Sequence, residues 1–507
     1  MKKHFDVLVA GAGVSGIAAA YYLQQNCPDK TFAILEGRDA IGGTWDLFRF
    51  PGIRSDSDMY TLGFSFRPWP EDDSIGEGEA IRRYLQDTAE EIGITDEIRF
   101  GTRIERASFS RADGRWTVYA RKTHTGEEEV YTCDFFWSCM GYYRYDEGFT
   151  PEFIGTERFE GRIVHPQSWD EGIDYAGKRV LIIGSGATAM TMLPVVARTA
   201  EKVTMVQRSP TYVIAWPRRD PLAGLLRWLL GPKRAHPIIR WKNIHLMALL
   251  YAFLRRFPRL SSRLLIRQAY KRLGKDFDVQ THFTPDYDPW DQRLCLVPDG
   301  DLFDAISEGH ADVVTGQIDT FTERGLALRS GTELEADLIV TATGFSLQWL
   351  GGIALDVDGK PFEPADAMIY KGCMLGGLPN CAFVFGYINS SWTLRAELVC
   401  EYVCKLIRFM DDNGYAECCP EPDPSVEALP PLDLKAGYVT RANGLIPSQG
   451  SRDPWRFNQN VALDKALLQD QPIDDATLRF TKRGRAVGTD SSRATDTLGA
   501  KAAQARS

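Results

Sequence analysis

Two glycine-rich turns, each between an apolar strand and a helix, have the residue types that bind a phosphate-bearing ligand. In the first, Gly11 permits a tight turn, Gly13 lets the backbone approach a pyrophosphate, and Gly16 lets the helix pack closely on the strand. We expect the pyrophosphate at the helix N-terminus, where free N–H groups and the helix dipole attract anions. Glu36 ends the next apolar strand and could accept hydrogen bonds from an adenosine ribose. This context favours a dinucleotide site over a glycine-rich turn without a ligand.

The second turn repeats the pattern with Gly184, Gly186 and Ala189. It differs at the end of the following strand, where an acidic residue would suit NAD but the chain has Arg208 and Ser209. An arginine can pair bidentately with the 2′-phosphate of NADP, and the serine hydroxyl could add a donor. The alternative is a solvent-exposed arginine at a strand end. Two dinucleotide sites in one chain favour electron transfer from a nicotinamide to a flavin over a simple dehydrogenase.

The same elements recur around both turns, and they define the fold class. In each unit, short alternating strands separated by turns interrupt the succession of strands and helices. Each unit then has an apolar strand in which an Asp precedes a Gly by seven residues, Asp134 before Gly141 and Asp337 before Gly344. The pattern predicts an α/β fold with doubly wound parallel sheets: two Rossmann-like dinucleotide-binding domains and a helical insert.

The positions of these elements divide the chain into domains. After Gly344 the chain is expected to return to the first domain, and small and polar residues dominate from Lys482 on, which predicts a disordered tail. The expected divisions are the first part of the first dinucleotide-binding domain (1–150), a linker (151–175), the second dinucleotide-binding domain (176–217 and 284–343), the helical insert (218–283), the second part of the first domain (344–481) and the tail (482–507).

Length, charge and cysteine spacing argue against several classes of protein. The chain has 507 residues and a net charge of −9, which argues against nucleic-acid binding, and it lacks the run of about 18 apolar residues that a membrane-spanning helix needs. Asp6 interrupts the apolar N-terminal run, which indicates a first β-strand and not a signal peptide. The ten cysteines have neither disulfide nor metal-site spacing, so we expect free thiols, no metal site and a cytoplasmic protein. No feature of the sequence indicates an oligomeric state.

Residues 221–275 form a basic segment with thirteen Lys and Arg and no Asp or Glu. The segment also carries leucines and aromatic residues, among them Trp228 and Trp241, which predicts amphipathic helices. Three interpretations remain open: a helical wall of a substrate tunnel, a peripheral membrane contact, or a solvated helical face. A membrane contact would suit an apolar substrate and leave the protein cytoplasmic but membrane-associated.

A twelve-residue segment between the two units is more specific than either turn. It has the form F-x-G-x-x-x-H-x-x-x-W-D, with Phe159, Gly161, His165 and Trp169 at its fixed positions. Without further context, the histidine could be a hydrogen-bonded linker residue.

A second pattern, G-G-x-W-x-x-x-x-F-P-G-x-x-x-D, begins at Gly42, includes Trp45 and ends at Asp56. Together the two patterns resemble the signature of type I Baeyer–Villiger monooxygenases, a group within the flavin-containing monooxygenase superfamily. The resemblance extends over about residues 1–480 and is strongest to the ethionamide-activating monooxygenase branch, whose active-site arginine segment is similar to residues 286–295.

The resemblance implies FAD in the first domain and NADPH in the second. In that family NADPH reduces the flavin, molecular oxygen forms a C4a-peroxyflavin, and one oxygen atom is inserted next to the carbonyl of a small apolar ketone, giving an ester or lactone. The loops around Trp392 and the helical insert are expected to set substrate specificity. Two alternatives are a flavin-containing monooxygenase that oxidises sulfur or nitrogen in small apolar substrates, and a non-catalytic, membrane-bound flavoprotein.

The resemblance also implies roles for individual residues. Arg293 would supply a fixed positive charge to the peroxide, and Asp56 would orient Arg293, although from the sequence alone Asp58 competes for that role. Trp45 would lie near the flavin. His165 would belong to the hinge between the domains and need not touch the substrate.

One departure from the family pattern leads to a test of cofactor preference. Many members have a Lys before the active-site arginine, but this chain has Gln292, so preference for NADPH should depend mainly on Arg208. Arg208→Ala is expected to raise the KM for NADPH much more than the KM for NADH, because only NADPH carries the 2′-phosphate. Steady-state kinetics with both cofactors test this, and equal rises in the two KM values would contradict the assignment.

Overall fold

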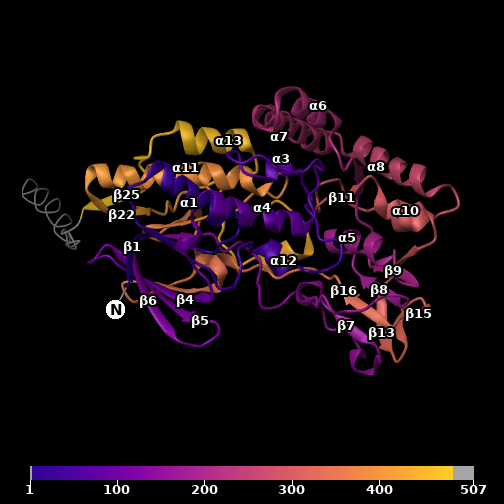
Figure 1. Ribbon diagram of the computed structural model, residues 1–507. Coiled ribbons are helices and arrows are strands. Elements are labelled where there is room, and N and C mark those ends of the chain that lie inside the picture. Colours follow the sequence, from indigo (N-terminus) through magenta and orange to yellow (C-terminus); the bar gives the residue numbers. More distant parts are fainter. Residues whose placement is uncertain (1–2, 483–507) are drawn as a thin grey trace, which may run out of the picture.

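Two sheets, each made of short apolar strands that alternate with helices, organise the molecule (Figure 1). The computed structural model describes residues 3–482. The central strands of both sheets are apolar along most of their length, since other elements cover both of their faces. The α/β fold class predicted from the sequence is confirmed, with two Rossmann-like units and a helical insert.

The first sheet is built around β1 (Lys3–Ala10), whose last four residues are fully buried. β1 pairs in parallel with β2 and β6, whereas β4, β5 and β6 form an antiparallel meander. The helices α1 (Val14–Asn26) and α11 (Trp392–Asn413) pack against each other beside this sheet. In spatial order its strands are β18 (Lys360–Phe362), β17 (Ala354–Val357), β4 (Thr102–Ser110), β5 (Arg115–Lys122), β6 (Glu128–Ser138), β1, β2 (Phe32–Leu35) and β3 (Ile98–Arg99), and β21 (Cys381–Phe383) also pairs with β6.

The second sheet consists of parallel strands. β8 (Arg179–Ile183), α5 (Ala187–Val196) and β9 (Lys202–Gln207) form the strand–helix–strand unit that surrounds the second glycine turn. The meander of this unit is a separate antiparallel sheet. In spatial order the parallel strands are β12 (Ala311–Thr315), β9, β8, β16 (Leu338–Thr341) and β7 (Arg162–Val164), and the meander is β13 (Ile318–Thr322), β14 (Gly325–Leu328) and β15 (Glu333–Glu335).

The chain crosses between the two units twice, and the two crossings touch. Part of the expected linker is the edge strand β7, which pairs with β16. His165 follows β7, and its Nδ1 accepts the backbone N–H of Gln167 at 3.1 Å. The neutral ring therefore carries its proton on Nε2, which donates to the carbonyl of Gly344 on the return crossing at 3.1 Å. Burial lowers the pKa of His165, so the imidazole is neutral.

The insert is a set of helices between β10 (Val213–Trp216) and β11 (Cys295–Pro298), which pair in parallel. Its helices are α6 (Pro221–Leu230), α7 (Pro232–Arg256), α8 (Pro258–Leu273) and α9 (Val279–His282). The first three lie along one side of the molecule, and α7 contacts α3 (Met59–Leu62) of the first unit (Figure 1). Within residues 3–482, no helix combines the length and apolar character needed to cross a membrane.

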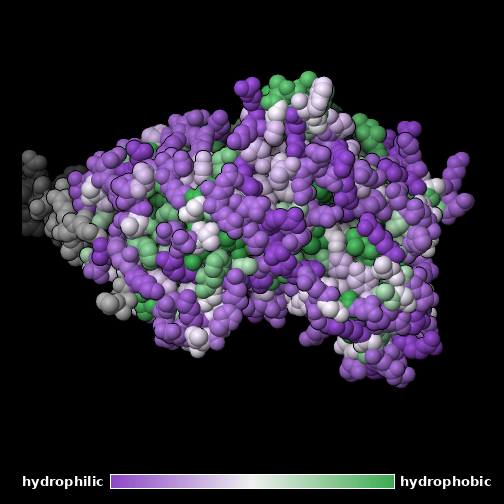
Figure 2. Space-filling view, viewed as in Figure 1, coloured by the Kyte–Doolittle hydropathy of each residue, from purple (hydrophilic) through white to green (hydrophobic). Residues whose placement is uncertain are grey.

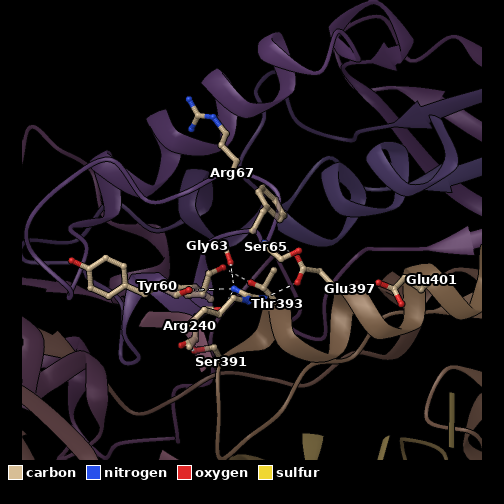
Figure 3. Close-up of polar contacts among 12 residues, drawn as sticks. Tyr60, Gly63, Ser65, Arg67, Arg240, Ser391, Thr393, Glu397 and Glu401 are labelled. Carbon is tan, nitrogen blue, oxygen red and sulfur yellow. Dashed lines mark hydrogen bonds and ion pairs between the residues drawn. The ribbon is translucent and has the colours of Figure 1, made fainter. Parts of the chain in front are cut away.

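A buried arginine anchors the insert to the first unit (Figure 3). Arg240 on α7 forms an ion pair of 2.6 Å with Glu397 on α11, and both side chains are only 9% exposed. Its Nη1 donates to the backbone carbonyls of Tyr60 (3.3 Å), Thr61 (3.1 Å) and Gly63 (2.7 Å). The charge is thus removed from water but has both a counter-ion and several hydrogen-bond partners, as a buried ion needs.

The C-terminal boundary differs from the expected one. β25 (Leu478–Lys482) pairs antiparallel with β22 (Tyr415–Pro420), and Lys482 lies opposite Tyr415. Lys482, the first residue of the expected tail, is thus the last residue of a strand, and the expected tail stays a prediction. The rest of the expected tail, 483–507, lies outside the described residues.

The Arg240 anchor predicts a large loss of stability when only one partner is removed. Arg240→Met leaves the Glu397 carboxylate buried without its counter-ion, which is expected to cost about 3–5 kcal/mol of the free energy of unfolding. Arg240→Met/Glu397→Met should be more stable than the single variant, since no buried charge remains. As a control, Arg103→Met removes an exposed pair with Asp146 and should cost about 0.2–1 kcal/mol. Urea unfolding gives the free energy of unfolding of all three variants. Equal losses of stability in Arg240→Met and in Arg103→Met would contradict the role of Arg240 as an anchor.

His165 predicts a contribution to the pH dependence of stability. Its pKa is lower in the folded protein than the unfolded value of about 6.5, so the unfolded state binds a proton first as the pH falls. Stability from this group is therefore present above that unfolded pKa and is lost as the pH falls through it towards the folded pKa. His165→Gln is expected to lose less stability between pH 7.5 and pH 5, about the range that spans the unfolded pKa, than the wild type. Unfolding midpoints of both proteins, measured across this pH range, test the prediction. The same dependence of the midpoint on pH in wild type and His165→Gln would contradict a buried neutral imidazole.

Candidate active site

A cavity of about 510 Å³ runs between the two units. Its walls come from the first glycine turn, the end of β2, the loops that precede α3, the segment before β11 and the start of α5. This volume is in the range of small-molecule and cofactor sites. The cavity thus brings together segments separated by more than two hundred residues of sequence.

The first glycine turn has the geometry that a pyrophosphate needs. Gly11 has a φ of +99°, and a Cβ there would lie 2.8 Å from the carbonyl oxygen of Cys139. A Cβ at Gly16 would overlap the carbonyl oxygen of Gly11, so the close approach of helix and strand requires glycine. α1 begins after Gly13 without a side-chain cap, which leaves the N–H groups of its first turn available to an anion.

Glu36 is buried at the end of β2, at one end of the cavity. Its Oε2 accepts the N–H of Ala12 at 2.7 Å, and its Oε1 accepts the N–H of Arg38 at 2.8 Å. Burial raises its pKa, and the two backbone donors oppose that rise. Each oxygen retains a lone pair, so the carboxylate could still accept ribose hydroxyls.

The second turn has the same backbone geometry but a more open surface. Gly184 has a φ of +131°, and a Cβ there would overlap the carbonyl oxygen of Ala342. A Cβ at Gly186 would meet nothing within 4 Å, and α5 starts after it without a side-chain cap. Ala189 is fully buried where α5 packs on the sheet. The open space and uncapped helix fit a second phosphate-bearing ligand.

Arg208 is the available cation at the end of β9. The preceding Gln207 is buried and donates to the carbonyl of His282 at 2.8 Å, so it faces away from solvent. Arg208 is exposed and has no ion-pair partner among residues 3–482. Ser209 lies beside it, and its carbonyl accepts the hydroxyl of Ser185 at 3.0 Å. Neither Arg208 nor Ser209 lines the cavity, so both lie on the outer part of this site.

Arg293 and Asp56 meet in the cavity. The distance from Nη2 of Arg293 to Oδ2 of Asp56 is 2.6 Å, and the side chains are 32% and 42% exposed. Asp56 is the largest cause of a raised pKa at Arg293, against the opposing effect of burial. The guanidinium therefore keeps its charge, and its Nη2 faces the Asp56 carboxylate.

The neighbouring Asp58 has a different environment. It is the N-cap of α3, where its Oδ1 accepts the N–H of Thr61 at 3.1 Å and the side-chain amide of Asn243, on α7, at 2.8 Å. The two aspartates that compete in the sequence thus separate in the structure, one facing Arg293 and the other bonded to the insert. Trp45 lies in the short helix α2 (Thr44–Leu47), is partly buried and lines the cavity.

An aromatic wall beside the ion pair was not assigned from the sequence. Tyr142 stacks on Trp392 with ring centroids 5.1 Å apart and an interplanar angle of 11°. The hydroxyl oxygens of Tyr142 and Tyr143 are 2.7 Å apart, and burial raises the pKa of both phenols. The indole N–H of Trp392 donates to Ser15 Oγ at 2.8 Å. Trp392 was singled out in the sequence, and the adjacent tyrosines directly after Gly141 were the further signal available for this wall.

The fixed residues of the twelve-residue segment 159–170 do not line the cavity. Phe159 is buried against Phe321. A Cβ at Gly161 would lie 2.6 Å from the carbonyl oxygen of Asp337, so this strand start approaches its neighbour closely. Trp169 is buried in the core of the second unit. These residues and His165 lie where the chain passes from the first unit to the second. Since they do not border the cavity, they would affect the reaction only through the relative position of the two units.

Comparison with known sequences shows similarity to flavin-binding monooxygenases. Residues 3–224 match the family described as flavin-binding monooxygenase-like. The chain is 49% identical over 490 residues to FAD-containing monooxygenase EthA of Mycobacterium tuberculosis, covering 96% of this chain and 100% of the relative. It is 44% identical over 487 residues to probable FAD-binding monooxygenase AlmA of an Acinetobacter species, covering 96% and 98%.

Among solved structures, a steroid monooxygenase bound to NADP is similar with a TM-score of 0.75 at 20% identity, covering 95% of this chain and 100% of that one. A cyclohexanone monooxygenase bound to ε-caprolactone gives a TM-score of 0.74 at 19% identity, with the same coverage. At these identities the similarity concerns the fold. The extent of the sequence match to the relatives shows that the chain belongs to the family of FAD-containing, flavin-binding monooxygenases, as its two sequence patterns indicated.

Proposed function

We propose that this chain is an NADPH- and O2-dependent flavoprotein monooxygenase that inserts one oxygen atom next to the carbonyl of a small apolar ketone, giving an ester or lactone. The observation that carries the proposal is the Arg293–Asp56 ion pair, held in a cavity that both dinucleotide-binding units line. The overall reaction consumes the ketone, O2, NADPH and a proton, and it yields the ester or lactone, NADP⁺ and water.

The cavity fits FAD, and the second turn fits NADPH. Glu36 would bind the adenosine ribose of FAD, the uncapped start of α1 its pyrophosphate, and Trp45 would border the flavin. Gly184, Gly186 and the start of α5 would bind the nicotinamide cofactor, with Arg208 at its 2′-phosphate. When bound, the flavin supplies hydride acceptance and oxygen activation, chemistry that amino-acid side chains lack.

Arg293 is the residue proposed to assist the oxygen transfer. Its guanidinium has no accessible neutral form, so it can stabilise negative charge that develops on the reacting oxygen atoms. Asp56 is proposed as a positioning residue, since its Oδ2 lies 2.6 Å from Nη2 of Arg293. An arginine without this partner would retain more rotamer freedom and lose orientation.

The aromatic wall supports a second requirement, exclusion of water. Tyr142, Trp392 and Trp45 border the same cavity as Arg293. Apolar ring faces strengthen electrostatic interactions within the cavity by removing solvent, and they suit an apolar substrate. The touching crossings at His165 and Gly344 lie where a relative movement of the units would open or close this space.

The alternative is oxidation of sulfur or nitrogen, which needs no migrating carbon. In that reaction the charge on Arg293 would matter less, because a neutral nucleophile attacks the activated oxygen directly. Ketone oxidation should therefore depend on the Arg293 side chain more strongly than oxidation of sulfur or nitrogen.

Arg293→Ala is expected to retain bound FAD and its reduction by NADPH while ester formation falls by about 10²–10³-fold, the cost of removing one charge-stabilising donor. Oxygen consumed by this variant should appear as hydrogen peroxide. Arg293→Lys should recover little activity, because an ammonium lacks the planar fork. Arg121→Ala, which breaks an exposed pair with Glu105 outside the cavity, is the matched control.

Product analysis with a ketone and a thioether, together with the ratio of NADPH consumed to product formed, distinguishes the proposals. Ester formation within twofold of the wild type in Arg293→Ala would contradict the role of Arg293. A wild-type enzyme that oxidises the thioether and converts no ketone, with Arg293→Ala equally active on the thioether, would establish the alternative.

A further inference from the structure

The outer surface of the insert exposes large apolar side chains. Trp228 is 80% exposed, Leu249 70% and Trp241 63%. Figure 2 shows apolar surface along the edge of the molecule formed by α6, α7 and α8, against a largely hydrophilic remainder of this face. Besides these three, the exposed apolar residues of the helices are Leu222, Leu225, Leu229, Leu230, Ile238, Leu246, Phe253, Phe257, Leu260, Leu264 and Tyr270. We call this set of side chains the outer face of the insert.

α7 uses polar as well as apolar residues on its buried side, and it exposes large apolar side chains. Its buried side presents His236, Arg240 and Asn243 to the first unit, where they donate to or bond with backbone and carboxylate groups. Its exposed side carries Trp241 and Leu249. A helix that covers a hydrophobic core buries its apolar stripe. α7 also buries Ala235, Ile239 and Leu254, so its inward side is part polar and part apolar, and its exposed apolar side chains lie outside the hydrophobic clusters of residues 3–482.

The same helices carry unneutralised positive charge. Five of the thirteen basic residues in 221–275 pair with carboxylates, namely Arg227, Arg240, Lys242, Arg255 and Arg272. The remaining eight, Lys233, Arg234, Arg256, Arg259, Arg263, Arg267, Lys271 and Lys275, are exposed and form no ion pair with any residue in the described range 3–482. On α8, Arg259, Arg263, Arg267 and Lys271 repeat every fourth residue, so they form one basic stripe beside Leu260 and Leu264.

We infer that the outer face of the insert docks onto a lipid bilayer that contains anionic headgroups. Exposed Trp, Phe and Leu flanked by Lys and Arg are the composition of helices that lie in a membrane interface, with apolar side chains among the acyl chains and cations at the headgroups. A second copy of this chain is a poorer partner. A two-fold contact through the same face would bring two sets of unneutralised cations together, at a Coulombic cost that anionic lipids do not impose.

The inner side of the insert is bonded to both segments that carry the ion pair of the cavity. Arg255 pairs with Asp291, two residues before Arg293, at 3.0 Å, and Asn243 donates to Asp58, two residues after Asp56, at 2.8 Å. Docking would therefore hold the cavity close to a bilayer, where apolar ketones concentrate. This consequence rests on the proposed function, whereas the docking itself does not.

Flotation of the full-length protein with vesicles tests the docking without any turnover. Binding to phosphatidylcholine vesicles that contain phosphatidylglycerol is expected to exceed binding to phosphatidylcholine alone by at least about tenfold, and to weaken with salt. Trp228→Ser/Trp241→Ser/Leu249→Ser should lose binding to both vesicle types. Arg259→Glu/Arg263→Glu/Arg267→Glu should lose only the preference for the anionic vesicles.

The matched control replaces apolar side chains of similar exposure elsewhere, Ile154→Ser/Leu445→Ser/Leu463→Ser, which are 71%, 67% and 56% exposed. This control should bind as the wild type does. Both insert variants should retain the wild-type thermal unfolding midpoint, since the replaced side chains are exposed. Oxidation of a water-soluble substrate should also be unchanged, so that failure of docking and failure of the proposed activity are separate results.

Two results would overturn the inference. One is wild-type binding to anionic vesicles that is no stronger than that of the triple serine variant of the insert. The other is a wild-type dimer in sedimentation that the triple serine variant abolishes, without vesicle binding by either protein, because the outer face would then be an interface between copies of this chain.

Discussion

One ion pair, Arg293 with Asp56, joins the two units inside the cavity. The chain that leaves the insert carries the arginine, and a loop of the first unit carries the aspartate. A guanidinium in a partly apolar cavity loses hydration, and the carboxylate 2.6 Å away offsets that loss and raises the pKa of the arginine. Neither charge has this partner unless the units dock. Because the two side chains of this ion pair come from different units, the pair favours one relative position of those units.

Three polar contacts between distant segments maintain that arrangement. His165 bonds to Gly344 where the chain crosses between the units in both directions. Arg240 and Asn243 bond the insert to the first unit through Glu397 and the loop around Asp58. Hydrogen bonds and buried ion pairs are directional, so they specify one relative position where an apolar contact would tolerate several. The insert thereby joins the second unit, from which it emerges, to the first.

The outer face of the insert combines exposed apolar side chains with basic ones. α7 and α8 are basic and rich in Leu and Trp, and the inner contacts use only part of the basic set. Eight large apolar side chains of these two helices are nevertheless exposed, among them Trp241 and Leu249. Such exposure is unusual on a monomeric protein and indicates a partner.

The sequence by itself determined the features that arise from short-range rules. Both strand–turn–helix units could be predicted, because Gly11 and Gly184 occupy backbone conformations that other residues avoid and because strand periodicity is local. The choice of Asp56 over Asp58 needed the family pattern, and the spatial reason appeared only in the fold, where one aspartate faces Arg293 and the other caps α3. The tertiary structure alone decided the contact of Asp58 with the insert, the aromatic wall, the strand made by part of the linker, and the partner of β25. Each of these depends on segments far apart in the sequence, and no local propensity carries information about which of them will meet.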